Sequence, residues 1–109
     1  MFRKGIMTEK KGDVFIDITI KNNPNHFLSP DDWDMVMGVK FGKISEESYK
    51  KYYIELLKKR WMFRKDEFIE LAKQGKDREV VLKCYCKKTF MTCHAYIAAN
   101  FMNNLMGKI

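Results

Sequence analysis

The sequence predicts a single α/β domain with a small, mainly parallel sheet and about four helices. Two segments have the character of buried strands, residues 13–20 and residues 79–86, and helical patterns separate them. Parallel strands need a long crossover connection, which is usually helical, so this order favours a parallel pair over a hairpin. The chain has 109 residues, enough for one domain, and no repeat, low-complexity tract or linker divides it.

The first predicted strand follows a short basic arm. Its side chains alternate strictly, with Val14, Ile16, Ile18 and Ile20 on one side and Asp13, Phe15, Asp17 and Thr19 on the other. Such alternation is typical of a strand with one buried face. We expect residues 1–12 to be an N-terminal arm or an edge strand and residues 13–109 to form the domain. Two strands make a thin sheet, so a third strand from the arm, or a homodimer that extends the sheet, would help to bury it.

Four helices are expected around these strands. The first begins at Ser29-Pro30, because serine caps a helix and proline fits its first turn, and it ends near Gly38 or Gly42. The others are predicted from similar signals, over residues 46–63 after a Ser45 cap, over residues 66–74 before a Gly75 C-cap, and from a Thr92 cap to about Met106.

The most informative stretch joins the second strand to the last helix. All three cysteines and one of the two histidines lie there, at Cys84, Cys86, Cys93 and His94. Cys84 and Cys86 share one face of the strand, because side chains alternate. Cys93 and His94 follow Thr92 in the first turn of a helix, where N–H groups and the helix dipole attract anions and stabilise a thiolate. Ligands of α/β proteins commonly bind at such junctions.

Three functions compete for this junction. The first is a pocket for an anionic small molecule such as a nucleotide, formed by Asp17, Cys86, Thr92, Cys93 and His94 with Cys84 in support. The second is a zinc site of Cys84, Cys86, Cys93 and His94, although the usual pair of cysteines separated by two residues is missing. In the third, Cys93 or His94 is catalytic, with Cys93 as the nucleophile. A simpler alternative is that Cys84 and Cys86 are buried apolar side chains.

Several segments match one family pattern together. They are Asp17-Ile18-Thr19, Ser29-Pro30, Gly42-Lys43-Ile44 with Tyr49 and Tyr53, Cys84-Tyr85-Cys86, and Cys93-His94. With them the chain resembles, over about residues 13–105, an uncharacterised bacterial and phage family, the domain of unknown function 488 family. The resemblance implies a two- or three-layer α/β domain and a phage or mobile-element context, and it brings no activity with it. Thr19 and Ala95 stand where the family usually has arginine, so the best charged donors for an anion are missing.

The charge balance favours an anionic partner. Lys and Arg total 21 against 14 Asp and Glu, a formal charge of +7. Residues 58–65 mix five cations, Lys58, Lys59, Arg60, Arg64 and Lys65, with two aromatic side chains. Such a mixture can bind phosphates and stack bases, so a nucleic-acid-binding accessory protein is an alternative function. The competing interpretation is an ordinary helix end, in which Trp61 and Phe63 enter the core and the cations are solvated.

Other features narrow the class of protein. We expect no signal peptide, and no apolar run is long enough to span a bilayer. The odd number of cysteines favours a cytoplasmic, reduced protein without a disulfide framework. No Gly-rich phosphate loop or hydrolase motif is present, so the sequence assigns neither an enzyme class nor a cofactor beyond the zinc candidate. His26 is expected on the surface or facing the Cys/His junction.

Overall fold

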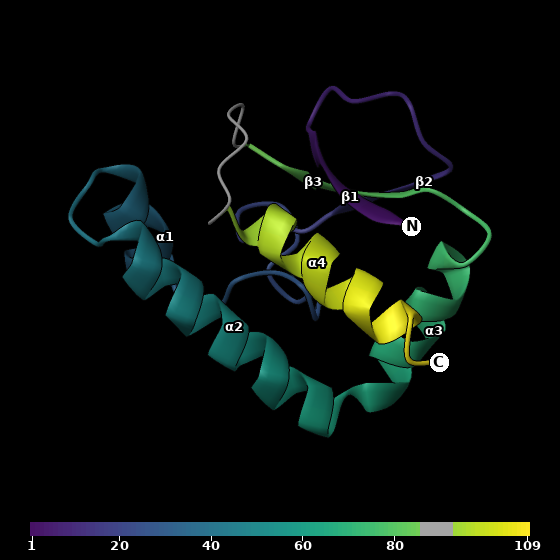
Figure 1. Ribbon diagram of the computed structural model, residues 1–109. Coiled ribbons are helices and arrows are strands. Elements are labelled where there is room, and N and C mark those ends of the chain that lie inside the picture. The colour runs from purple at the N-terminus through teal and green to yellow at the C-terminus, as the bar shows by residue number, and fades with distance from the viewer. Residues whose placement is uncertain (86–92) are drawn as a thin grey trace.

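The computed structural model describes residues 1–85 and 93–109. Within these residues the predicted small α/β domain is confirmed, with a three-stranded parallel sheet and four helices. In chain order the elements are β1 (Phe2–Ile6), β2 (Val14–Asp17), α1 (Trp33–Lys40), α2 (Glu46–Phe63), α3 (Lys65–Gly75), β3 (Val80–Cys84) and α4 (His94–Met106). The sheet forms one layer, the helices lie on one side of it, and α4 packs directly against it (Figure 1).

The sheet has the strand order β1–β3–β2, and both outer strands run parallel to β3. The N-terminal arm therefore contains an edge strand, one of the two forms expected for it. The two strands predicted from hydrophobic patterns are present but shorter than predicted. β2 covers residues 14–17 of the predicted 13–20, and β3 covers residues 80–84 of the predicted 79–86, of which residue 86 lies outside the described part.

The two faces of the sheet are covered differently. Val80, Leu82 and Cys84 are fully buried against the helical layer, while Lys83 lies on the opposite face with its Nζ 4.8 Å from the centre of the Phe15 ring. The crossover of residues 7–13 passes over this outer face. It runs so close to β3 that a Cβ atom on Gly12, whose φ is +150°, would lie 2.6 Å from a Val81 methyl group. Glycine is therefore required at that point of the crossover.

The first helix begins later than the sequence predicts. α1 starts at Trp33, and its N-cap is Asp32, whose carboxylate accepts from the Met35 N–H at 3.2 Å. Ser29 does not cap a helix, because its hydroxyl donates to the Asn23 carbonyl oxygen at 2.6 Å. Ser29 and the following Pro30 are instead buried in the loop before the helix. The prediction of a helix start at Ser29 was wrong because a contact within this loop replaces the cap.

The other helices are close to their predicted positions. Ser45 caps α2 as predicted, accepting from the Ser48 N–H at 3.1 Å, and α2 continues through Phe63. Gly75 is the last helical residue of α3 instead of its C-cap. The N-cap of α4 is Cys93 instead of Thr92, and Thr92 lies outside the described residues.

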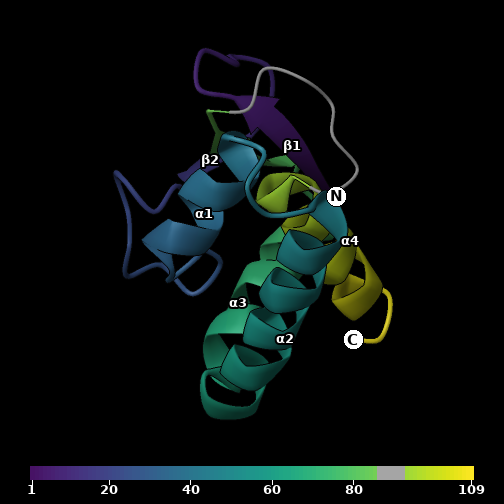
Figure 2. The ribbon, with the colours of Figure 1, turned by 90° about the vertical axis from the view of Figure 1, so that its left-hand side faces the viewer.

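The core lies between the sheet and the helices. Tyr53 of α2 is its largest fully buried side chain, and its hydroxyl donates to the Leu28 carbonyl oxygen. The rings of Phe27 and Phe68, in the same cluster, pack at a centroid distance of 4.7 Å with their planes tilted by 60°. Turned by 90°, the molecule shows α2, α3 and α4 together on one side of the sheet (Figure 2). In the described part of the chain, no helix has the length and apolar character needed to cross a membrane.

Candidate functional site at the carboxyl edge of the sheet

The predicted ligand- and metal-binding residues that the structure describes lie at the carboxyl edge of the sheet. Because the strands are parallel, they end at the same edge. β2 ends at Asp17, β3 ends at Cys84, and α4 begins at this edge with Cys93 as its N-cap and His94 as its first residue. The sequence predicted that the strand ends and the start of the last helix meet, but it placed Asp17 and Cys84 within longer strands and Cys93 after a Thr92 cap. The other two predicted residues of this site, Cys86 and Thr92, lie outside the described residues.

Cys84 and Cys93 are in direct contact through their sulfur atoms. The two Sγ atoms are 3.5 Å apart and are not joined by a disulfide. Cys84 is fully buried, and 5% of Cys93 is exposed. Both side chains belong to the core cluster, so Cys84 fits the description of a buried apolar side chain. The sequence places both cysteines at one junction, but it contains no signal for this contact between a strand end and a helix N-cap.

His94 connects the start of α4 to the chain just beyond β2. Its Nε2 atom lies 3.1 Å from the Ile18 carbonyl oxygen, which can only accept, so Nε2 carries a proton. The ring stands edge-on to Tyr53, with an interplanar angle of 81° and a centroid distance of 5.7 Å. Burial raises the pKa of Tyr53 well above its ordinary value, so this phenol stays protonated. His94 therefore ties the start of α4 to the chain just after β2.

Asp17 is held by the loop that follows β2. Its carboxylate accepts from the Thr19 N–H at 2.9 Å and the Thr19 hydroxyl at 2.7 Å, and from the Asn22 side-chain amide at 2.8 Å. The same amide donates to the Tyr85 hydroxyl at 2.6 Å. Burial opposes the charge of Asp17, but these hydrogen bonds and the nearby His94 outweigh it and lower the pKa of Asp17 below its usual value. Asp17 is thus an ionised group that orders the loop and adds a negative charge to the edge.

No three His, Cys, Asp or Glu side chains of residues 1–85 and 93–109 come together as a group that could hold a metal ion. Three members of the predicted zinc set, Cys84, Cys93 and His94, are at the edge. The ring of His94 is directed at the Ile18 carbonyl oxygen, and the fourth member, Cys86, is outside the described part.

The basic segment of residues 58–65 divides into two groups of side chains. Arg60 donates to three carbonyl oxygens of the loop before α1, including that of Phe27 at 2.9 Å. Arg64 forms an ion pair with Glu67 at 2.8 Å. Lys58, Lys59 and Lys65 are exposed, and the Lys65 ammonium lies 5.2 Å from the centre of the Trp61 ring. Only three of the five predicted cations are therefore directed outward for a partner.

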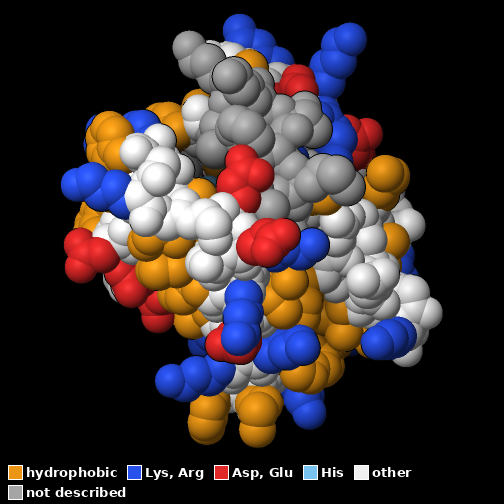
Figure 3. Space-filling view, turned by 60° about the vertical axis from the view of Figure 1, so that its left-hand side comes forward, with side chains coloured by type: hydrophobic (Ala, Val, Ile, Leu, Met, Phe, Trp, Pro, Cys, Tyr) orange, Lys and Arg blue, Asp and Glu red, His pale blue; other side chains and the backbone are white. Residues whose placement is uncertain are grey.

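The apolar residues of this segment also divide. Trp61 packs edge-on against Phe68 at a centroid distance of 5.8 Å, as the simpler interpretation expects. Phe63 does not enter the core, because 78% of it is exposed, and its neighbour Met62 is 73% exposed. Figure 3 shows hydrophobic and Lys or Arg side chains side by side at the lower end of the molecule. The end of α2 is therefore an exposed apolar tip, and the exposed Lys58, Lys59 and Lys65 lie close to it in the sequence.

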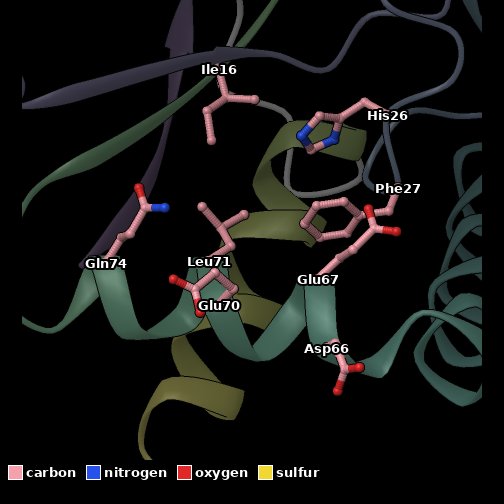
Figure 4. A pocket seen from close by; sticks show the side chains of 8 residues that line it. All are labelled: Ile16, His26, Phe27, Asp66, Glu67, Glu70, Leu71 and Gln74. Atoms are coloured by element: carbon pink, nitrogen blue, oxygen red, sulfur yellow. The ribbon is translucent and has the colours of Figure 1, made fainter.

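A groove that the sequence did not predict lies between β2 and α3. Its volume is about 550 Å³, and it is lined by Ile16, His26, Phe27, Asp66, Glu67, Glu70, Leu71 and Gln74. In Figure 4, Ile16 comes from β2, His26 and Phe27 from the loop before α1, and the remainder from α3. His26 stacks on Phe27 at 4.5 Å, and its Nδ1 accepts from the Leu28 N–H at 3.0 Å. No sequence signal marks this groove, because three separate segments form it.

Known proteins add no identification to this geometry. Comparisons with protein-family models, with curated proteins and with solved structures found no match. The residues at the carboxyl edge and at the tip of α2 are therefore the basis for assigning a function.

Proposed function

We propose that the protein binds a small anionic molecule, such as a nucleotide, at the carboxyl edge of its sheet. The start of α4 is the observation that carries this proposal. Its N-cap, Cys93, makes no side-chain hydrogen bond to the first turn, and that turn contains no acidic residue. The N–H groups of a first helical turn have no partner within the helix, and together with the helix dipole they attract an anion.

The neighbouring residues have different parts in this proposal. Cys93 and His94 stand beside the first-turn N–H groups, whereas Cys86 and Thr92 are members of the site on the sequence prediction alone. Asp17 orders the loop after β2, since its oxygens already accept three hydrogen bonds. It does not contact the anion directly, because its negative charge would repel it. The net charge of +7 supports an anionic partner. The family resemblance supports a phage or mobile-element protein. The odd number of cysteines supports a place in the cytoplasm, where thiols stay reduced.

Isothermal titration calorimetry with ATP and with inorganic phosphate at low ionic strength tests this proposal. His94→Glu places a carboxylate in the first turn of α4 and is expected to weaken binding at least about tenfold, which is about 1.4 kcal/mol. The matched control is Asn104→Glu, which changes the charge equally on an exposed residue at the far end of the same helix. Equal weakening by both variants, or no binding of either probe to the native chain, would contradict the proposal.

A second candidate function is the binding of single-stranded nucleic acid by the tip of α2. Exposed Phe63 and Met62 beside Lys58, Lys59 and Lys65 favour it, because bases stack on aromatic side chains while lysines contact phosphates. Fluorescence anisotropy with a labelled single strand at low salt should show binding that is lost when the three lysines are changed to Gln. Changing Lys10, Lys43 and Lys108 to Gln alters the net charge equally and is the control. A similar loss in both triple variants would argue against a localised site.

A third candidate is a zinc- or cysteine-dependent activity. The 3.5 Å between the Cys84 and Cys93 Sγ atoms is close to the spacing of two thiolates on one tetrahedral zinc ion, about 3.8 Å for Zn–S bonds of about 2.3 Å. Cys86 and His94 would complete the predicted set of ligands. Native mass spectrometry of protein purified without chelators should then show one zinc ion, lost in Cys84→Ala. A metal-free mass would count against zinc, and the same spectrum distinguishes a monomer from a homodimer.

A further inference from the structure

We propose that Cys84 and Cys93 form a redox-active dithiol, which hydrogen peroxide or a similar two-electron oxidant converts to an intramolecular disulfide. The proposal concerns the chemistry of the two sulfur atoms. It goes beyond ligand binding at the same edge and does not depend on it.

The geometry of the pair carries the inference. The Sγ atoms are 3.5 Å apart, and a disulfide requires about 2.05 Å, so the two sulfur atoms need to approach by only about 1.5 Å. Cys84 is the last residue of β3, and Cys93 is the N-cap of α4. The bond would therefore connect the central strand of the sheet directly to the helix that packs on it. Cys84 and Cys93 are the two cysteines that the structure describes, and it places their sulfur atoms in contact.

The two thiols differ in their surroundings, and this difference assigns their order of reaction. Cys93 stands at the N-terminus of a helix of 13 residues without an acidic side chain in its first turn, an environment that stabilises a thiolate. Cys93 is also 5% exposed, whereas Cys84 is completely buried. Cys93 is therefore the thiol that meets the oxidant, and Cys84 is the thiol that resolves the product.

The chemistry proceeds in two balanced steps. The Cys93 thiolate attacks one oxygen of hydrogen peroxide, the O–O bond breaks, and the products are a sulfenic acid on Cys93 and, after protonation, one water molecule. The Cys84 sulfur then attacks the Cys93 sulfur, the S–O bond breaks, and the second water molecule leaves with the thiol proton of Cys84. Two thiols lose two electrons in total, and the peroxide gains them. A thiol reductant reverses the result by exchange.

The test uses the full chain, reduced and then treated with hydrogen peroxide below the concentration that unfolds it. The number of thiols accessible to a thiol reagent in denaturant is expected to fall from three to one. The intact mass should fall by two hydrogen atoms, and dithiothreitol should restore both values. Digestion with chymotrypsin identifies the pair, because cleavage after Tyr85 separates Cys84 from Cys86. The expected product is a disulfide-linked pair of peptides that contain Cys84 and Cys93.

Variants provide the matched comparison. Cys86→Ser is expected to retain disulfide formation, and Cys84→Ala or Cys93→Ala is expected to abolish it. Phenylarsine oxide gives a second readout, since its arsenic binds two adjacent thiols with release of one water molecule. This adduct should form on the native chain and on Cys86→Ser and be lost in the other two variants.

A disulfide that involves Cys86, a disulfide between two chains, or oxidation confined to Cys86 would overturn the proposal. The native chain alone identifies the pair, so a variant that fails to fold does not decide the result. Nucleotide binding is not part of this experiment, so its outcome is independent of the proposed function.

Discussion

At the scale of single residues, Arg60 shows how packing can remove a side chain from the function that its neighbours suggest. It stands in a basic run, yet its guanidinium donates to the carbonyl oxygens of His26, Phe27 and Ser29. Arg60→Ala would remove a donor from all three oxygens, of which that of His26 also accepts from the Ser29 N–H. We therefore expect the free energy of unfolding in urea to fall by about 2–3 kcal/mol. Arg60→Lys should recover only part of this loss, because all three hydrogen bonds come from Nη1 and the lysine Nζ is one bond closer to the backbone than that atom.

The neighbouring Lys59 is the control for this prediction. It is exposed, and Lys59→Ala removes the same charge. Its expected effect on the free energy of unfolding is within about 0.5 kcal/mol. If both alanine variants were equally stable, the contacts of Arg60 would not hold the loop before α1.

His26 makes stability depend on pH. Burial, with the positive charges of Arg64 and Arg60, lowers the pKa of His26 despite the opposing effect of Glu67. Because the folded pKa lies below the unfolded value of about 6.5, the stability from neutral His26 is complete above that pH and is lost as the pH falls below it. Protonation also removes the acceptor for the Leu28 N–H. We therefore expect the free energy of unfolding to fall between about pH 7 and pH 5.

The variant His26→Asn isolates this contribution. Its side-chain oxygen can accept from the Leu28 N–H, but it does not titrate. Urea unfolding across the same pH range should show a smaller fall in the variant than in the native chain. His94 is present in both proteins, so its titration cancels in the comparison. Equal slopes would mean that His26 has nearly the same pKa in the folded and unfolded chains.

At the scale of elements, the sequence predicted what local signals determine. The alternation of β2 and the Ser45 cap of α2 are properties of neighbouring residues, and both are confirmed. The start of α1 was wrong because Ser29 donates to Asn23, a competition that depends on how the loop is folded. The Cys84–Cys93 contact and the groove beside His26 needed distant segments to meet, so periodicity contained no information about them. The site was thus predictable as a junction but not as a set of contacts.

The end of α3 gives a prediction that opposes helix propensity. Alanine is about 1 kcal/mol better than glycine within a helix. At Gly75, however, a Cβ atom would lie 2.3 Å from a ring carbon of Phe2, whose side chain is itself only 1% exposed. We expect Gly75→Ala to lower the free energy of unfolding by about 1–3 kcal/mol, because the buried ring cannot move without disturbing β1. Thermal and urea unfolding measure this effect.

Gly107, at the C-cap of α4, is the matched control. A Cβ atom there would approach nothing closer than 3.6 Å, and its φ is −69°. Gly107→Ala should therefore be neutral or slightly stabilising. A stabilising Gly75→Ala would show that Phe2 has room to shift, and that β1 is less tightly packed against α3 than the structure indicates.

At the scale of the whole molecule, a single helical layer on a three-stranded sheet distributes stability unevenly. Four of the five residues of β3 are buried, and five residues of α4 are buried beneath the strands. In α1 only Gly38 is buried. Its first residue, Trp33, is 46% exposed, and its C-cap, Phe41, is 67% exposed. The candidate site therefore lies where the most buried strand meets the most buried helix. The carboxyl edge is supported by buried elements, whereas α1 is held mainly by its contact with α2.

Hydrogen exchange is the measurement that tests this distribution. Amides within β3 and α4 are expected to exchange last, at rates that approach those of global unfolding, and amides of α1 are expected to exchange first among the helices. Mass spectrometry of peptides, corrected for intrinsic exchange rates, gives the order, and peptides from the middle of α2 are the internal comparison. Early exchange in β3 would place the candidate site on a mobile part of the molecule and weaken both proposals for its edge. Equal protection of α1 and β3 would mean that the fold opens only as one unit, so that contact with α2 alone is enough to hold α1.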